Sequence, residues 1–124
     1  EPQCRFESYP GVMNTVEQSV NLLDELGMDN AGIVLDTFHA NIEESSMTEA
    51  VKIAGKKLIH IHFMENNRCT PGLGTVNFRE IVQTLVQTGY SGYLSLEFLV
   101  DQDIMSKSID YLKSIERVVR IQTS

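Results

Sequence analysis

The chain has 124 residues, of which 42% are hydrophobic and 22% charged, a composition that suffices for one compact domain. Its 17 acidic and 10 basic residues give a formal net charge of -7, which argues against nucleic acid or an anionic membrane as a partner. Cys4 and Cys69 form no paired motif, so we expect free thiols. The first residues show no signal-peptide pattern, and no apolar run approaches the about 20 residues of a membrane span. We therefore expect a cytoplasmic protein.

Apolar residues at helical spacing predict a first helix from Asn14 to Leu26. Asn14 is the expected N-cap, with Glu17 three residues later, and Gly27 is the expected stop. The next segment, Ala31–Leu35, is short, apolar and rich in β-branched residues. These features predict a strand that is buried on both faces.

Beyond this strand, Thr37–Ser45 is the first long loop candidate. Ser46, followed by Glu49, has the signature of a capping box and predicts a helix that ends at Gly55. The segment Lys57–Phe63 then alternates as a strand.

A second long loop candidate, Met64–Val76, precedes a helix that we expect to begin at Asn77 and to end at Gly89. Tyr93–Leu99 is the next predicted strand. A final helix is expected to start near Ser106 and to present an apolar face at a period of 3.6 residues. That face comprises Ile109, Leu112, Ile115, Val118 and Val119.

Strands that alternate with helices of this length predict βαβ units and a parallel sheet. Both long loop candidates follow strands. In a (β/α)8 barrel the active site is built from such loops, whereas the reverse connections are short. A complete barrel needs about 250 residues, so the chain is expected to form only part of one. Because it begins at Glu1 without an initiator Met, we expect the numbering to begin inside a longer gene product.

Residues that can bind a metal stand at the end of every predicted strand. Asp36 follows AGIVL, His62 follows LIHI, and Glu97 follows YLSL. An ionisable group at the end of a buried strand is costly unless a partner or a cation offsets its charge. Each residue taken alone is as readily explained by a helix cap or a salt bridge, but the repetition on successive strands predicts a metal site.

The segments EPQCRFE, LDTFHANIEE, HIHFMENNRCTPGLG and LSLEF together resemble the xylose-isomerase-like barrel superfamily. Within it they are most similar to the ketose 3-epimerases of the D-tagatose and D-psicose type. The match runs from Glu1 to about Leu99. The resemblance implies an α/β fold in which residues 1–124 form the C-terminal half of a (β/α)8 TIM barrel with parallel strands, the first half being absent from this chain.

The resemblance also implies the roles of particular residues. In the family, four residues at strand ends hold one divalent cation, and a Glu, a His and an Arg hold the sugar. The matching metal ligands are Glu1, Asp36, His62 and Glu97. The matching sugar-binding residues are Glu7, His39 and Arg68. Two of the ligands, Glu1 and Glu97, also occupy the positions of the catalytic base and acid. The role of Glu1 depends on the resemblance alone, since the strand that it is expected to end lies before the numbering begins.

Three carboxylates and one imidazole suit an oxygen-loving cation, and we expect Mn2+, with Mg2+ or Co2+ as alternatives. The expected reaction is C3 epimerisation of a free ketose, by proton abstraction through an enediolate that the metal stabilises. The expected partner is a small sugar, without nucleic acid or membrane. The intact protein is expected to be a homo-oligomer, a dimer or a tetramer.

Three kinds of alternative stay open. The first is another enzyme that uses the same metal site: an aldose–ketose isomerase, a hydroxypyruvate-type isomerase or an inosose dehydratase. An apurinic-endonuclease-like barrel needs more metal-binding histidines than the three present and a basic cleft. A half-barrel on its own exposes two sheet edges and would be an inactive fragment.

Neighbouring polar residues have simpler expectations. His60 shares a strand face with His62 and is expected to be a hydrogen-bonded core residue, or else to support the metal ligands from behind. Glu43 and Glu44 are expected to be solvated or to cap a helix. The segment Glu65–Asn67 is expected to shape the loop that carries Arg68.

Overall fold

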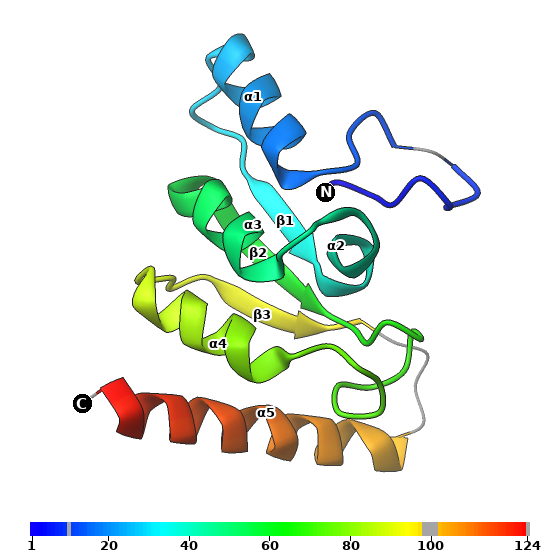
Figure 1. Ribbon diagram of the computed structural model, residues 1–124, viewed down its shortest axis with the longest axis vertical. Helices are drawn as coiled ribbons and strands as arrows, with labels where there is room; N and C mark the ends of the chain where they lie inside the picture. The colour runs from blue at the N-terminus through cyan, green and yellow to red at the C-terminus, as the bar shows by residue number, and fades with distance from the viewer. Residues whose placement is uncertain (10, 98–101, 124) are drawn as a thin grey trace.

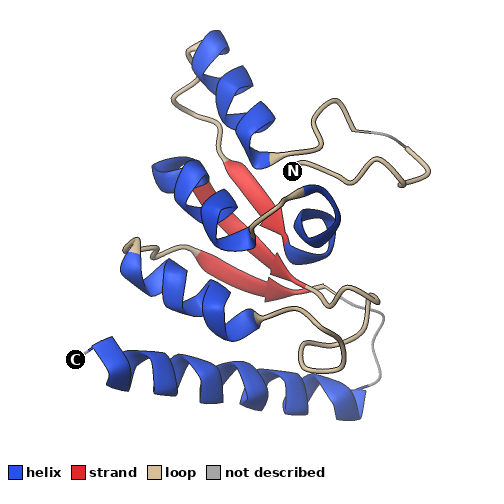
Figure 2. Ribbon diagram, viewed as in Figure 1, coloured by secondary structure: helices blue, strands red, loops and turns tan. Residues whose placement is uncertain are grey.

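The computed structural model describes residues 1–9, 11–97 and 102–123. Its centre is a parallel sheet of three strands in the order β1-β2-β3, connected by helices (Figures 1 and 2). This arrangement confirms the predicted α/β fold with parallel strands. The elements in chain order are α1 (Val16–Leu26), β1 (Ile33–Asp36), α2 (Thr37–Glu43), α3 (Met47–Ala54), the 3-10 turn η1 (Gly55–Lys57), β2 (Leu58–Phe63), α4 (Phe78–Gln87), β3 (Tyr93–Leu96) and α5 (Gln102–Thr123).

The carboxyl ends of the strands are level with one another. Asp36 of β1 lies opposite His62 of β2, and His62 lies opposite Ser95 of β3. Glu97 follows β3 directly, and its main-chain N–H donates to the carbonyl of Phe63. The polar residues at the strand ends are therefore brought to one edge of the sheet, as their positions after apolar runs predict.

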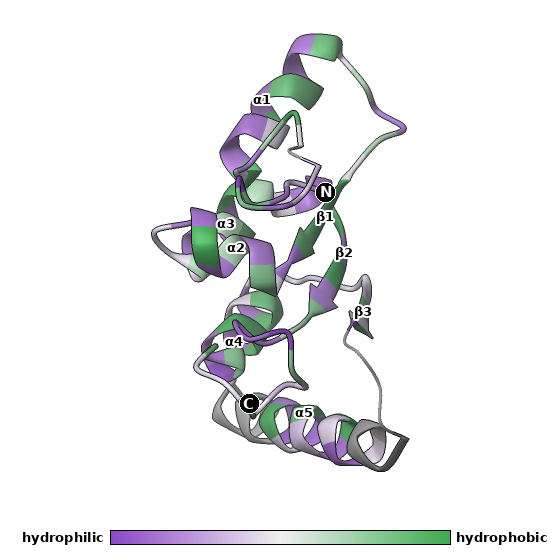
Figure 3. Ribbon diagram, turned by 90° about the vertical axis from the view of Figure 1, so that its right-hand side faces the viewer, coloured by the Kyte–Doolittle hydropathy of each residue, from purple (hydrophilic) through white to green (hydrophobic). Residues whose placement is uncertain are grey.

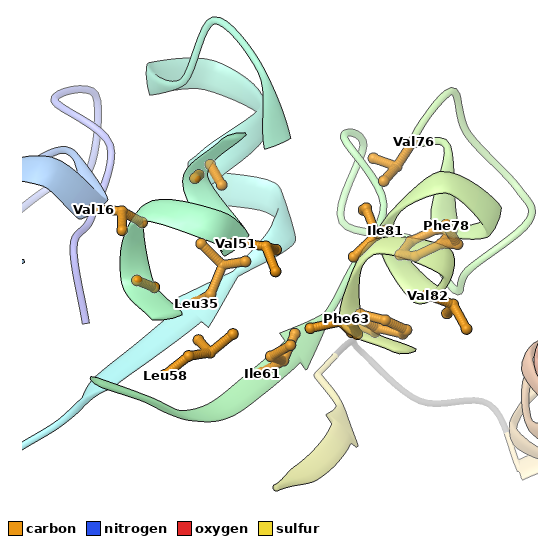
Figure 4. Packing of buried hydrophobic residues seen from close by; sticks show 14 of the residues in the cluster. Val16, Leu35, Val51, Leu58, Ile61, Phe63, Val76, Phe78, Ile81 and Val82 are labelled. Carbon is orange, nitrogen blue, oxygen red and sulfur yellow. The ribbon is translucent and has the colours of Figure 1, made fainter. Parts of the chain in front are cut away.

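The hydrophobic core lies between the sheet and the helices that cover one of its faces, among them α3 and α4, which lie on one side of the strands in Figure 3. Alternate residues of a strand point to opposite faces, so Ile61 and Phe63 enter this core while His60 and His62 face the other way. Phe63 packs against Phe78 of α4 with ring centroids 5.1 Å apart (Figure 4). The apolar packing on one face thus directs the histidines of β2 toward the opposite face.

Helix α1 begins one residue later than expected for an Asn14 cap. Its N-cap is Thr15, whose hydroxyl accepts from the main-chain N–H of Gln18, while the Gln18 side chain accepts from Thr15 in return. The Asn14 side chain instead donates to the carbonyl of Gln3. The reciprocal pair satisfies two free N–H groups at the start of the helix, while the Asn14 side chain is engaged by Gln3 and does not act as the cap.

The prediction of a loop over Thr37–Ser45 is wrong, because residues 37–43 form helix α2. Asp36 caps this helix with its own side chain. Glu44, just beyond it, accepts a hydrogen bond of 2.7 Å from the main-chain N–H of Val16, so it caps α1 as well. A helix of seven residues is too short to show a clear apolar period, which explains why the sequence pattern did not reveal it.

The last helix also begins earlier than expected, at Gln102 rather than near Ser106. On its predicted apolar face Ile115 is buried and Leu112 packs against the core, whereas Ile109 is exposed. The side chains of Val118 and Val119, and the part of the predicted strand beyond Glu97 as far as Leu99, lie outside the described residues. Among the described residues, no helix combines the length and the apolar character that a membrane span requires.

Candidate metal and sugar site

Asp36 is the most deeply buried of the predicted ligands, with 2% of its surface exposed. Its Oδ1 accepts hydrogen bonds from the main-chain N–H groups of Phe38, at 2.7 Å, and His39, at 3.1 Å. Its Oδ2 lies 3.8 Å from Nδ1 of His62. Burial raises the pKa of the Asp36 carboxyl, although the two hydrogen bonds oppose that shift. One oxygen therefore fixes the start of α2, and the other is left for the site.

His62 lies at the centre of the ligand cluster. Its Nδ1 is 3.3 Å from a Glu1 carboxylate oxygen and is also in contact with the carboxylate of Glu97. Among the described residues, this buried nitrogen has no hydrogen-bond partner. The neighbouring His60 is hydrogen-bonded to Ser95 at 2.8 Å, and its ring meets that of His62 edge-on with centroids 5.1 Å apart. His60 thus has the expected hydrogen bond, but it is only half-buried and lies on the face of the sheet opposite the hydrophobic core, where its ring packs against His62.

This arrangement fits a divalent cation. Three carboxylates that face one unsatisfied nitrogen repel one another, and a cation among them would offset their charge and take up the nitrogen lone pair. The side chains of Asp36, His62 and Glu97 each offer one ligand atom, and these atoms lie within 4.8 Å of one another. A second such group consists of Glu1, Asp36 and His39. A set dominated by oxygen donors suits Mg2+ or Mn2+.

Glu1 reaches the site from an N-terminal segment that has no regular structure and lies beside β1 and α2 (Figure 1). Contacts with Met13 and Glu43 help to hold this segment in place. Gln3 donates from its main chain to the carbonyl of Met13 at 3.1 Å. Arg5 binds both carboxylate oxygens of Glu43 with its guanidinium and donates its main-chain N–H to the same carboxylate at 2.7 Å. Glu43 is therefore an anchor for the segment and not a solvated residue.

The predicted sugar-binding residues adjoin the metal ligands. His39, in the first turn of α2, places Nε2 3.8 Å from a Glu1 carboxylate oxygen. Glu7 has a carboxylate oxygen within 4.8 Å of a ring nitrogen of His39. Arg68 forms an ion pair with Glu7, and its guanidinium lies 4.1 Å above the ring of Phe38. The structure therefore brings all of the predicted site residues into one continuous polar cluster.

The loop that carries Arg68 is organised by the buried carboxylate of Glu65. Its two oxygens accept from the main-chain N–H groups of Gly72, at 2.7 Å, and Val76, at 3.0 Å. A Cβ added at Gly74 would overlap this carboxylate, so the loop closes tightly on Glu65. Arg68 itself has a φ of 61°, in the left-handed region that non-glycine residues seldom adopt. The expectation that Glu65–Asn67 shapes this loop is thus supported by hydrogen bonds.

Two further hydrogen-bonded contacts support the site and have no signal in the sequence. The hydroxyl of Thr37 donates to the carbonyl of Met64 at 2.7 Å and accepts from the N–H of Met64 at 2.8 Å, which joins the ends of β1 and β2. The main-chain N–H of Cys4 donates to Nδ1 of His39. Both contacts join residues far apart in the chain, and no local pattern in the sequence predicts them. Both cysteines are free, as expected, with Cys4 buried and Cys69 exposed.

Comparison with known proteins identifies the family. The family model described as "Xylose isomerase-like TIM barrel" matches residues 1–115. The chain belongs to the xylose isomerase-like TIM barrel family. Among curated proteins, the D-psicose 3-epimerase of Enterocloster bolteae is 42% identical to this chain over 98 residues. These residues are 79% of this chain and 32% of the relative.

Solved structures agree with membership of the xylose isomerase-like TIM barrel family. The structure of an L-ribulose 3-epimerase matches 98% of this chain and 48% of its own, with a TM-score of 0.86 and 27% identity. A D-psicose 3-epimerase with D-tagatose, from Clostridium cellulolyticum H10, matches 95% of this chain and 47% of its own, with a TM-score of 0.79 and 29% identity. The chain spans about a third of the length of the curated relatives it matches, so its sheet is part of a TIM barrel.

Proposed function

We propose that this chain supplies the metal-binding and sugar-binding residues of a ketose 3-epimerase. The observation that carries the proposal is the buried Nδ1 of His62, which faces the carboxylates of Glu1, Asp36 and Glu97 but has no hydrogen-bond partner among the described residues. Relatives named as epimerases of D-psicose and L-ribulose support the reaction class. The chain's net charge of -7 favours a neutral sugar over DNA as the substrate.

In this proposal Glu1, Asp36, His62 and Glu97 hold one divalent cation, with Mn2+ favoured. When bound, the cation polarises the carbonyl oxygen and the neighbouring hydroxyl of a ketose, and so lowers the cost of removing the proton from C3. The carboxylate of Glu97 takes that proton, and Glu1 returns a proton to C3 from the opposite face of the sugar. These two transfers invert C3 and leave the bonds of the sugar otherwise unchanged.

The remaining polar residues orient the sugar. Arg68 and Glu7 form an ion pair that offers donors and an acceptor to sugar hydroxyls, and Phe38 supports the guanidinium from below. His39 adjoins both this pair and Glu1, so it can contact an oxygen next to the reacting carbon. These contacts hold C3 close to the two carboxylates, because a sugar held by several hydrogen bonds keeps one orientation.

A chimaera tests the proposal in a complete barrel. The segment of the Enterocloster bolteae D-psicose 3-epimerase that aligns with this chain is replaced by this chain, and the purified protein receives D-psicose and saturating Mn2+ in deuterated water. We expect formation of the C3 epimer with deuterium incorporated at C3. Glu97→Gln should slow both processes at least about 100-fold, as expected for loss of a general base.

Mn2+ binding and the thermal midpoint of each chimaera are measured in parallel, so that loss of metal or misfolding is distinguished from loss of the base. Exchange at the parental rate in Glu97→Gln would show that Glu97 is not the base. An aldose product without any C3 epimer would favour the aldose–ketose isomerase alternative on the same metal site.

A further inference from the structure

The two histidines that border the carboxylate cluster are bound differently at Nδ1. Nδ1 of His62 is buried and, in the described part of the chain, has no hydrogen-bond partner. Nδ1 of His39 accepts a hydrogen bond of 3.3 Å from the main-chain N–H of Cys4. Both residues of this bond are buried, with 1% of Cys4 and 7% of His39 exposed.

The donor of this hydrogen bond is held from both sides. The carbonyl of Cys4 accepts from the main-chain N–H of Glu7 at 3.2 Å, which closes a tight turn. The next residue, Arg5, is bound to Glu43 of α2 through both its main chain and its guanidinium. The N–H of Cys4 is therefore directed at α2 by contacts that do not involve His39.

The acceptor is held equally firmly. The main-chain N–H of His39 donates to Oδ1 of Asp36, which fixes the first turn of α2. The ring packs edge-on against Phe38 with centroids 5.2 Å apart. With main chain and ring both fixed, Nδ1 of His39 stays directed at Cys4, and Nε2 stays directed at the site.

We infer that the main-chain N–H of Cys4 fixes the tautomer of His39, the expected sugar-binding residue, and thereby leaves a hydrogen-bond donor at Nε2 on the side of the site. A main-chain N–H can only donate, so the nitrogen that accepts from it carries a lone pair. In a neutral imidazole the proton then resides on the other nitrogen, Nε2. Cys4 is thus a positioning residue that acts through its main chain.

This tautomer distinguishes two trios of side chains that, by distance alone, could each hold a metal ion. The trios Glu1–Asp36–His39 and Asp36–His62–Glu97 both bring ligand atoms within 4.8 Å of one another. A protonated nitrogen has no lone pair for a cation, so the imidazole of the first trio is excluded while that of the second is free. The donor role of His39 toward the sugar rests on the proposed epimerase function, whereas the tautomer does not.

Nitrogen NMR of the 124-residue chain with 15N-labelled histidine, at a pH where the rings are neutral, tests the tautomer. We expect a pyridine-type resonance for Nδ1 of His39, a pyrrole-type resonance for its Nε2, and a through-hydrogen-bond coupling between Nδ1 and the amide nitrogen of Cys4. With Zn2+ as a diamagnetic probe, Nδ1 of His62 should shift while His39 keeps its proton on Nε2. A pyrrole-type Nδ1, or loss of the Nε2 proton of His39 on Zn2+ addition, would overturn the inference.

Two variants separate the main chain of Cys4 from its thiol. Cys4→Ala removes the thiol and keeps the N–H, so the coupling and the tautomer should persist. Cys4→Pro removes the N–H, and the coupling should disappear while His39 becomes a mixture of tautomers. If Cys4→Pro does not fold, the spectrum of the unmodified chain still decides the question.

The donor role is tested in the chimaera with D-psicose. Saturation with the sugar should shift the Nε2 proton of His39, and absence of a shift would refute this role. Because deuterium incorporation at C3 is measured separately, failure of the donor role is distinguished from failure of the epimerase proposal.

Discussion

The metal-binding and sugar-binding residues of the candidate site are held in place in two different ways. Asp36 and His62 lie on adjacent strands, opposite each other in the register of the sheet. Glu1 and Arg68 lie on segments without regular structure, and polar contacts hold those segments in place. The first pair is positioned by the ladder of the sheet and by the apolar core beneath it. The second pair depends on Glu43 and Glu65, two carboxylates that are not among the predicted metal ligands.

This difference predicts that metal binding and sugar binding can be weakened independently of each other. A strand residue moves only if the sheet moves, so the proposed metal ligands on β1 and β2 are held rigidly. The segments that carry Glu1 and Arg68 can loosen while the sheet stays intact, because polar contacts, with the carboxylates of Glu43 and Glu65 prominent among them, hold them in place of a strand ladder. Variants of the strand residue should therefore affect metal binding first, and variants of the loop anchors should affect sugar binding or stability first.

The largest expected effect is at Asp36, where the two roles of one carboxylate can be separated. Asp36→Asn keeps an oxygen to cap α2 but removes the charge, and Asp36→Ala removes both. Both variants should bind Mn2+ more than about 100-fold more weakly, since even loss of residues that only support a ligand costs 10–100-fold. Isothermal titration calorimetry with Mn2+ measures this loss.

Stability without metal distinguishes the two variants. Because burial raises the pKa of Asp36, its charge destabilises the metal-free fold, and Asp36→Asn should be at least as stable as the parent. Asp36→Ala should lose about 1 kcal/mol through the missing cap. Urea unfolding without metal measures both, and unchanged Mn2+ affinity in Asp36→Asn would exclude Asp36 as a ligand.

The strand-borne part of the site could be predicted from the sequence, and the reason is physical. An apolar run that ends in an ionisable residue predicts both a buried strand and the end of that strand. Asp36, His62 and Glu97 satisfy this pattern, and parallel pairing brings them together. Glu1 is the first residue of the sequence, so this pattern cannot be sought before it, and only the family resemblance predicts its position.

The loop anchors could not be predicted, because they depend on contacts across long stretches of chain. Arg5 and Glu43 are separated by 38 positions, and Glu44 caps a helix that begins 28 positions earlier. Sequence spacing carries no information about such pairs until the fold brings them together. The role of Glu65 could be predicted in part. Its position close to Arg68 in the sequence indicates that it shapes the loop, but not that its carboxylate accepts hydrogen bonds from Gly72 and Val76.

The next largest effect is expected at Glu65, and it should leave the metal cluster unaffected. In Glu65→Gln only one oxygen remains, so one of the N–H groups of Gly72 and Val76 loses its buried acceptor. This change should lower the free energy of unfolding by about 1–3 kcal/mol. It should also raise the KM for the sugar in the chimaera while Mn2+ affinity stays at the parental value.

A matched control is Glu49→Gln on α3, whose side chain is 59% exposed. A substitution there should change the free energy of unfolding by less than about 0.5 kcal/mol. If Glu65→Gln weakened Mn2+ binding as much as sugar binding, the loop and the metal cluster would be one coupled unit and the contrast between them would fail.

Arg68 should show a smaller effect on stability and a clear one on the sugar. In Arg68→Gly the left-handed backbone is relaxed, which returns roughly 1–2 kcal/mol. Loss of the contact with Phe38 costs about 0.5–1 kcal/mol, and the partly exposed pair with Glu7 contributes about 0–1 kcal/mol. The free energy of unfolding should thus change little, while the KM for the sugar rises.

Arg68→Lys is the companion variant, because it keeps the charge and the strained backbone but lacks the planar guanidinium. It should also raise the KM, by less than Arg68→Gly. A parental KM in both variants would remove Arg68 from the sugar site, whatever happens to stability.

The smallest effect is expected at Glu43, and it should depend on pH. Hydrogen bonds from the side chain and the main chain of Arg5 hold the pKa of Glu43 below its ordinary value of 4.5. A lowered pKa means that the ion pair stabilises the fold above that value, and that this contribution is lost as the pH falls through the lowered pKa. Glu43→Gln should therefore be less stable than the parent at neutral pH, and the difference should vanish in acid.

Urea unfolding of both proteins across this pH range measures the difference, with Glu25→Gln on the exposed side of α1 as the control that should show no such trend. Glu43→Gln should also weaken Mn2+ binding modestly at neutral pH, because the segment that carries Glu1 loses its anchor. A difference in stability that stayed constant from neutral to acidic pH would mean that Arg5 and Glu43 do not form this ion pair in solution. In that case Glu1 would be held by the contacts of Gln3 and Cys4, and the contrast between the two kinds of support would apply to Arg68 alone.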